Sequence, residues 1–271
     1  MAGFRHVLRA LTGREDYSVW NTLRLNYMLF PSPVARCLPL KVGRHIDTKG
    51  LHRGGIVFDE GVLPHRFMLR LGISPWPIYS NRSMRTYLWF HSGAKMIVGD
   101  EVDINSGVRI VVTNGATLTL GNHCFVNQNS LLYCSRAITF GEHCTLGWDC
   151  QICDSDFHLL HNAARASIPN PTAPIVIGKG VWLANHVSVG KGCTIASHSI
   201  VASHSLVCKD LLVERALYAG IPAKLKRTGV TFITDHKEEA RLRRRFSREQ
   251  CPSIPYHVPD IEHTHSQDTA L

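Results

Sequence analysis

The 271-residue chain lacks an even number of cysteines: it has nine, and only Cys150 and Cys153 have the C-x-x-C spacing. An odd number with a single such pair argues against a disulfide framework and favours a reducing compartment. No apolar run reaches the ~18 residues that a membrane-spanning helix needs. The amino-terminal residues have no compact apolar stretch followed by a small-residue cleavage site, which argues against a signal peptide. We therefore expect a cytoplasmic protein.

Positive charge is in excess, with 30 Lys and Arg against 21 Asp and Glu and a net charge of +9. Such an excess favours an anionic partner: nucleic acid, a membrane surface or a phosphorylated ligand. Residues 240–249 alone carry five arginines and are expected to form a helix. No interleaved aromatic and basic motif accompanies them, so we expect no nucleic-acid binding. A peripheral contact with the inner face of a membrane stays open.

Large apolar residues recur every sixth position through the middle of the chain. They fall in four series: Val98, Ile104 and Ile110; Leu120, Val126, Leu132 and Ile138; Phe140, Leu146 and Ile152; and Ile177, Leu183, Val189, Ile195, Val201 and Val207. A period of six fits neither a helix nor a hairpin meander, but a short strand and a tight turn repeated. Three such units make one coil of a triangular prism, so the pattern predicts an all-β protein built as a parallel β-helix.

Small residues accompany this repeat. Glycine follows five series positions, where we expect it to give the turn backbone angles that a side chain would penalise: Gly99, Gly121, Gly141, Gly178 and Gly190. A small or β-branched residue stands four positions after most series members. Cysteine fills that place four times, and we expect these cysteines to pack as small hydrophobes: Cys124, Cys144, Cys150 and Cys193.

With these features the chain resembles the hexapeptide-repeat acyltransferases, and among them the O-acetyltransferases of bacterial polysaccharides and simple sugars. The resemblance covers about residues 93–228. It is carried by "CDSDFH", by "IVIGKGVWLANHVSVGKGCTIASHSIVASHSLVCKD" and by "YAGIPAKLKR". It implies a left-handed coil, a homotrimer and acetyl-CoA as the acyl donor. The chain departs from the family pattern at Ala184, His204 and Cys208, close to where coenzyme A is expected.

His158 falls six residues after Ile152, so a histidine replaces the aliphatic residue at the next step of the repeat. The chain then leaves the repeat for a proline-containing excursion over residues 159–174. A neutral imidazole suits a general base that takes the proton of an attacking hydroxyl. Asp154 or Asp156 would accept the other ring N–H and orient the base. The resemblance also places the family's catalytic histidine at His158.

Other site residues are implied by matching the resemblance residue by residue. Asn185 and Ser203 would line the pantetheine groove, and three cations would meet the phosphates of the coenzyme: Lys209, Lys224 and Arg227. Trp148 and His161 are candidates for contact with the acceptor sugar.

We expect three regions: a helical and irregular segment over 1–92 with a possible first coil at 54–61, the β-helix over 93–228, and a basic helix and tail over 229–271. A helix over 17–30 would dock through a face that carries Leu23, Tyr27 and Phe30. The expected activity is direct transfer of acetyl from acetyl-CoA to a sugar hydroxyl of a surface polysaccharide or its precursor, without a metal.

Three alternative functions stay open beside the O-acetyltransferase. A sugar N-acetyltransferase would use the same base. A zinc enzyme like the β-helix carbonic anhydrases would need three histidines; His123 and His143 occupy matching turns of two coils, but neither has a third partner at ligand spacing with His158. A non-catalytic scaffold or sugar-binding module would bind no acetyl-CoA.

Overall fold

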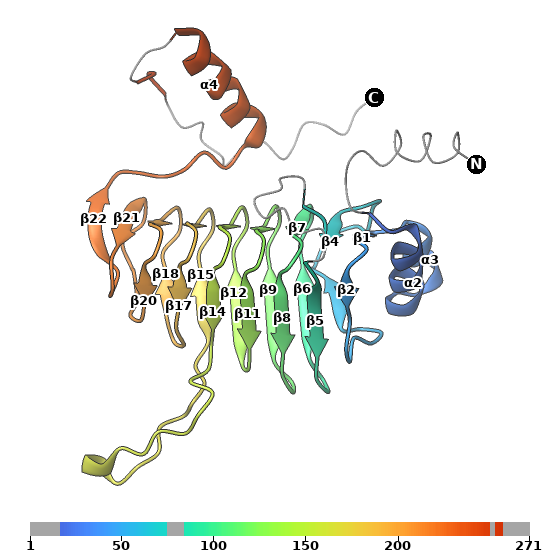
Figure 1. Cartoon of the computed structure of the whole chain (residues 1–271), viewed down its shortest axis with the longest axis horizontal. Helices are drawn as coiled ribbons and strands as arrows, with labels where there is room; N and C mark the ends of the chain where they lie inside the picture. The colour runs from blue at the N-terminus through green and yellow to red at the C-terminus, as the bar shows by residue number, and fades with distance from the viewer. Residues whose placement is uncertain (1–16, 75–83, 250–252, 257–271) are drawn as a thin grey trace. The chain divides into compact units, whose positions relative to one another are not determined.

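Three parallel sheets form the sides of a coiled chain (Figure 1). The computed structural model describes residues 17–74, 84–249 and 253–256. Neighbours within a sheet are three strands apart in the chain, as in the series β1, β4, β7 and the series β2, β5, β8. Each coil thus contributes one strand to every sheet and stacks on the coil before it. This is the parallel β-helix that the period of six predicts.

The strands are short, as a corner every six residues requires. In the described residues the first sheet has nine strands: β1 (Leu40–Val42), β4 (Leu69–Leu71), β7 (Val102–Ile104), β10 (Phe125–Val126), β13 (Thr145–Leu146), β16 (Trp182–Leu183), β19 (Ile200–Val201), β21 (Ala216–Ala219) and β22 (Lys224–Thr228). The second sheet, counted over the same residues, has seven: β2 (Ile46–Asp47), β5 (Thr86–Phe90), β8 (Arg109–Val112), β11 (Leu131–Cys134), β14 (Gln151–Cys153), β17 (Ser188–Val189) and β20 (Leu206–Val207). The third, again within the described ranges, has six: β3 (Ile56–Phe58), β6 (Lys95–Val98), β9 (Thr117–Leu120), β12 (Ala137–Phe140), β15 (Ile175–Ile177) and β18 (Thr194–Ile195). The final strand, β22, runs antiparallel to β21.

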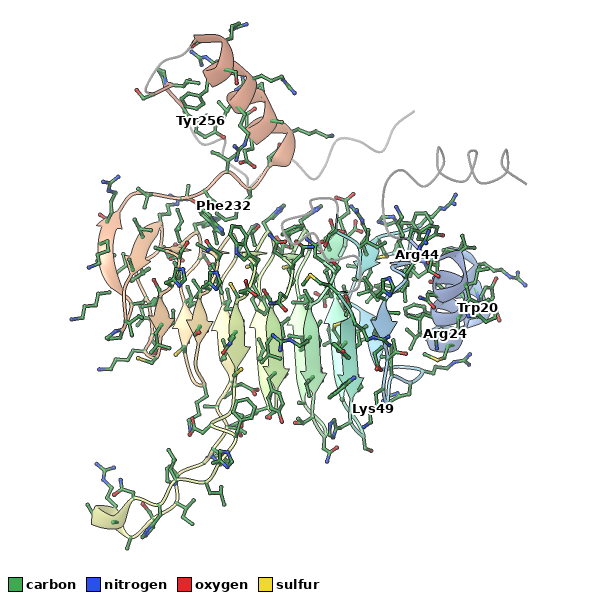
Figure 2. All side chains as sticks on the ribbon, viewed as in Figure 1. Trp20, Arg24, Arg44, Lys49, Phe232 and Tyr256 are labelled. Carbon is green, nitrogen blue, oxygen red and sulfur yellow. The ribbon has the colours of Figure 1, made fainter. Side chains whose placement is uncertain are left out.

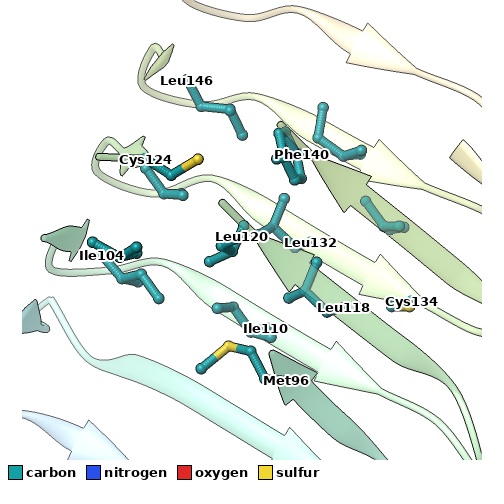
Figure 3. Close-up of a cluster of buried hydrophobic side chains, with 14 of the residues drawn as sticks. Met96, Ile104, Ile110, Leu118, Leu120, Cys124, Leu132, Cys134, Phe140 and Leu146 are labelled. Carbon is teal, nitrogen blue, oxygen red and sulfur yellow. The ribbon is translucent and has the colours of Figure 1, made fainter. Parts of the chain in front are cut away.

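The repeat positions form the core. Every residue of the four predicted series is buried, and so are the small residues four positions later, the four cysteines included. Figure 3 shows Ile104, Leu132 and Leu120, one from each sheet, turned to the inside of the coil. Burial of each such side chain contributes about 1.5–3 kcal/mol, so the column of aliphatic residues is the main source of stability.

The glycines after the series positions have a different purpose from the one we expected. Gly99, Gly121 and Gly141 are not among the residues with positive φ. A Cβ added at Gly141 would instead lie 2.7 Å from the backbone nitrogen of Lys179 in the next coil, and the distances at Gly99 and Gly121 are similarly short. Glycine is therefore required there by the close approach of two coils rather than by its backbone freedom.

A pair of glycine variants tests this reason. We expect Gly141→Ala to lower the free energy of unfolding by about 1–3 kcal/mol, because the new methyl group overpacks the contact between coils. Gly190→Ala is the matched control, since the nearest atom to its added Cβ is 3.7 Å away. Denaturant unfolding measures both, and equal losses in the two variants would contradict the explanation.

Many of the residues with positive φ stand three positions after the series members. Asn, Asp and His tolerate this left-handed conformation better than other side chains. They occupy many of these turns: His123, Asn129, His143, Asp149, His186, His198 and His204. Several of the chain's 16 histidines are therefore explained by backbone geometry rather than by chemistry.

The β-helix begins well before residue 93. Strands β1 to β5 already belong to the three sheets, so residues 40–90 contain coils where we expected an irregular segment. The proposed first coil at 54–61 does contain a strand, β3. The connections from β3 to β4 and from β4 to β5 are longer than a six-residue turn, which is why the period is not visible there.

In the part of the chain that the structure describes, the short helices α2 (Val19–Leu29) and α3 (Ser32–Arg36) precede the first coil. The helix over 17–30 docks as predicted, but through another face. Leu25 and Leu29 are buried, whereas Leu23 and Tyr27 are 41% and 50% exposed. Phe30 of the predicted face is buried. The prediction was wrong for Leu23 and Tyr27 because the buried stripe also contains polar residues, and Asn26 completes it by hydrogen bonds with Leu40 of β1. Figure 2 shows Trp20 and Arg24 on the surface of α2.

The carboxyl-terminal part, residues 233–271, forms a separate unit. It contains α4 (His236–Glu249), which matches the predicted basic helix. Apart from residues 253–256, the predicted tail lies outside the described residues. None of the helices in the described ranges is both long enough and apolar enough to cross a lipid bilayer.

Candidate active site

The chain leaves the prism between β14 and β15 (Figure 1). Its two branches are held at the base by an antiparallel bridge between Ser155 and Thr172, and the Asp156 N–H donates to the Pro171 carbonyl at 2.9 Å. At the far end the one-turn 3-10 helix η1 (Ala163–Arg165) reverses the chain. The excursion therefore starts at Ser155, four residues earlier than the predicted residue 159.

His158 lies just beyond this paired base and is exposed. Its backbone N–H donates to the Asp156 carbonyl at 2.7 Å, which turns the chain at the base of the excursion. The preceding Phe157 has a positive φ of 61° and its ring centroid lies 4.6 Å from that of Tyr133 on β11. Within the described residues the His158 ring has no hydrogen-bond partner, and the residue is accessible to a ligand because it is exposed.

Asp154 is fully buried and has a structural position. Its carboxylate accepts the backbone N–H groups of Ser135 at 2.6 Å, Arg136 at 2.7 Å and Ala137 at 2.9 Å. These amides belong to the turn between β11 and β12. Asp154 is thus directed at a neighbouring coil and not at His158, unlike the orienting role that the sequence suggests.

Asp156 is also engaged elsewhere. Its Oδ2 lies 2.5 Å from Nζ of Lys191, which in addition donates to the Asn170 carbonyl at 2.8 Å. Lys191 therefore joins both branches of the excursion to the next coil. The prediction that Asp154 or Asp156 orients the imidazole is not met in this chain: each carboxylate is held by a contact between coils.

Removal of the Lys191 ammonium group should loosen the base of the excursion. The pair is partly shielded, with side-chain exposures of 25% and 29%. We expect Lys191→Met to cost about 1 kcal/mol, which is about a fivefold rise in amide hydrogen exchange. The exchange of Asp156 and Ala173, whose N–H groups bond across the base, measures the effect. Lys191→Arg should retain slow exchange, and unchanged exchange in Lys191→Met would contradict this account.

The two residues predicted to contact the acceptor sugar are Trp148, which precedes His158 in the chain, and His161, which follows it. Trp148 is half-buried in the turn between β13 and β14, where its carbonyl accepts the His186 N–H at 3.0 Å. His161 is exposed in the excursion beside Asn162, which pairs with Ser167. Both stay candidates for sugar contact.

Of the predicted donor residues, the structure brings Asn185 and Ser203 together. They occupy equivalent turns of successive coils, and the Ser203 hydroxyl donates to Asn185 Oδ1 at 2.7 Å. Lys224 and Arg227 are exposed on β22, and Lys209 is exposed after β20. The buried Ala184 fits its turn between coils.

A column of side chains next to Asn185 and Ser203 was not predicted. Asn129 donates to Asp149, whose Oδ2 lies 3.9 Å from Nε2 of His186. The His186 ring stacks on His204 with a centroid distance of 4.5 Å. The signal for this column is the recurrence of polar residues three positions after successive series members. His204, which departs from the family pattern, is therefore supported by a ring partner in the previous coil.

The cysteines near this site are weak acids, and the described residues contain no cluster of metal ligands. Burial, and then the charge of Asp154, raises the pKa of the Cys153 thiol to about 11, so it is protonated at neutral pH. Burial likewise raises the pKa of Cys134 to about 12. His123 and His143 stack at 4.6 Å. In the part of the chain that the structure describes, no three His, Cys, Asp or Glu side chains gather as a metal site.

The relatives of this chain among known proteins include two acetyltransferases of Escherichia coli K12. The chain is 33% identical over 138 residues to the putative colanic acid biosynthesis acetyltransferase WcaF of Escherichia coli K12, and this alignment covers 51% of the chain and 70% of that protein. It is 26% identical over 113 residues to the galactoside O-acetyltransferase of the same organism, with 42% and 55% covered. No family model matches the chain.

Among solved structures, the polySia-specific acetyltransferase NeuO aligns over 79% of the chain and 99% of its own length, with 18% identity and a TM-score of 0.46. A hexapeptide-repeat acetyltransferase of Vibrio cholerae complexed with acetyl coenzyme A aligns over 51% and 71%, with 26% identity and a TM-score of 0.42. Because both TM-scores are below 0.5, the family assignment depends on the sequence relatives and not on these structures. Since one-third identity extends over more than two-thirds of WcaF, and the six-residue repeat builds the coil, the chain belongs to the hexapeptide-repeat acetyltransferases.

Proposed function

We propose that the protein transfers an acetyl group from acetyl-CoA to a hydroxyl of a sugar in a surface polysaccharide or its precursor. The observation that carries this proposal is the identity with WcaF over most of that protein's length. The galactoside enzyme among the relatives also acetylates a sugar oxygen, as its name states.

His158 is the general base of this proposal. One ring nitrogen takes the proton of the acceptor hydroxyl while the sugar oxygen attacks the thioester carbonyl carbon. The C–S bond then breaks, the coenzyme leaves as the thiol with the proton that His158 received, and the sugar carries the ester. The exposed ring at the base of the excursion supports this role. The raised pKa of Cys153, near 11, supports direct transfer over an acyl-cysteine intermediate.

The donor would lie along the turns of Asn185 and Ser203. Their joined side chains mark a polar strip between successive coils, suited to the amides of pantetheine. Lys209, Lys224 and Arg227 are exposed cations that would meet the coenzyme phosphates.

We further propose a homotrimer that works in the cytoplasm, at or near the inner face of the membrane. The excursion supports association, because Phe157, Leu159, Leu160 and Ile168 are exposed on it although they are apolar. Sedimentation equilibrium tests this directly, and a monomer at micromolar concentration would exclude the trimer.

The decisive experiment is thiol release from acetyl-CoA in the presence of a panel of sugars, amino sugars and acidic oligosaccharides. The proposal expects release with hydroxyl acceptors and an ester-linked acetyl group in the product, which mild base removes. An amide product with amino sugars alone would identify an N-acetyltransferase. Absence of acetyl-CoA binding would favour a scaffold.

A further inference from the structure

Helix α4 presents a continuous basic face. Its cations recur at intervals of three and four residues, which places them on one side of a helix: Lys237, Arg241, Arg244, Arg245 and Arg248. This face extends over about 16 Å, at 1.5 Å per residue. A hollow of about 370 Å³ lies along it, lined by the four arginines of this series.

The carboxylates of the helix do not neutralise this face. Glu238 makes a two-bonded pair with Arg241 at 2.7 and 2.6 Å. Glu249 is shared by Arg245 at 2.8 Å and Arg248 at 3.2 Å. Within the described residues Arg244 has no carboxylate partner. Five cations against two carboxylates leave three positive charges on one face. The remaining arginine, Arg243, lies on the opposite side and pairs with Glu239.

The other residues of α4 argue against a membrane surface and against single-stranded nucleic acid as the partner of the basic face. A helix that lies in a membrane surface needs an apolar face, but the apolar residues of α4 are only Ala240, Leu242 and Phe246, and Leu242 is buried. Binding of single-stranded nucleic acid uses aromatic side chains interleaved with the cations, and the residues of α4 that form the basic face include no aromatic one. Guanidinium groups in a row suit carboxylates that recur along a flexible polymer, because each forms paired hydrogen bonds with one carboxylate.

We propose that α4 is a binding site for an acidic sugar polymer, and that the acceptor of this enzyme is polyanionic. The choice of a sugar polymer rests on the proposed function; the choice of an acidic polymer rests on α4 itself. Residues 229–235 join β22 to α4. A chain bound by α4 is thereby tethered to the β-helix through this segment, which raises its local concentration.

The test uses the full-length protein with polygalacturonate as the acidic probe and dextran of matched length as the neutral one. We expect binding of polygalacturonate, weaker at high salt, and no binding of dextran. The variant R241Q/R244Q/R245Q/R248Q should weaken the polygalacturonate Kd by about tenfold or more, whereas R243Q should stay within about twofold. Far-ultraviolet circular dichroism checks that α4 remains helical in both.

The outcomes separate the two proposals. Unchanged polygalacturonate binding in the fourfold variant, equal binding of dextran, or tighter binding of single-stranded RNA or of phosphatidylglycerol vesicles would overturn the role of α4. Acetylation of a monosaccharide should be the same in the fourfold variant and the wild type. If polygalacturonate binds through α4 but no sugar is acetylated, the inference about α4 holds and the proposed function fails. If a sugar is acetylated but polygalacturonate does not bind, only the inference about α4 fails.

Discussion

Replacement of His158 by alanine is expected to lower kcat by about 10²- to 10⁴-fold, the usual range for loss of a general base. The attacking hydroxyl would then have to lose its proton to water instead of to a positioned imidazole. The side chain is exposed and has no hydrogen-bond partner in the described residues, so its removal should not affect folding. Steady-state kinetics with acetyl-CoA and the best acceptor of the panel measures the loss.

Two controls make this result specific. The Kd for coenzyme A, measured by calorimetry, should be the same in His158→Ala and the wild type, because the donor residues lie on other turns. His161→Ala is the matched variant, an exposed histidine in the same excursion, and should at most raise the KM for the acceptor. Turnover of His158→Ala at the wild-type rate would remove His158 from the mechanism.

The coil could be predicted because its main determinant is local and periodic. One large apolar residue in every six is visible in the sequence, and each of these residues is buried. Apart from the possible coil at 54–61, the coils before residue 93 escaped prediction because long connections interrupt the period between β3 and β5. The purpose of Gly141 was also missed, since it depends on the backbone of Lys179 in the following coil, which no pattern within one turn reveals.

Of the candidate site, the sequence predicts the place of His158 but not the contacts around it. The position of His158 follows from the repeat, because a histidine stands where the next aliphatic residue should be. The partners of the two aspartates do not follow from it. Asp154 binds amides 17 to 19 residues away, and Asp156 binds a lysine from the next coil. These contacts depend on how coils stack, so sequence proximity to His158 suggested a catalytic role that the geometry does not support.

Asp154 therefore gives the second large expected effect, and it concerns stability. Asp154→Ala would leave the N–H groups of Ser135, Arg136 and Ala137 without their acceptor. An unsatisfied amide costs about 1–3 kcal/mol, but this turn is partly open to water, which would replace some of the lost bonds. We expect a loss of about 3 kcal/mol in the free energy of unfolding, and a fall in Tm of about 6–12 °C for a chain of this size.

Asp154→Asn and Asp156→Ala complete the experiment. The asparagine keeps one acceptor oxygen but directs an NH₂ group at amides that are themselves donors, so its loss should be intermediate. Asp156→Ala removes only a partly exposed ion pair and should cost about 1 kcal/mol or less. Thermal unfolding and kcat are measured on the same samples. If Asp154→Ala kept the wild-type Tm and lost turnover as His158→Ala should, Asp154 would belong to the catalytic machinery. A lower Tm with normal turnover in the folded fraction would establish that its carboxylate holds two coils together.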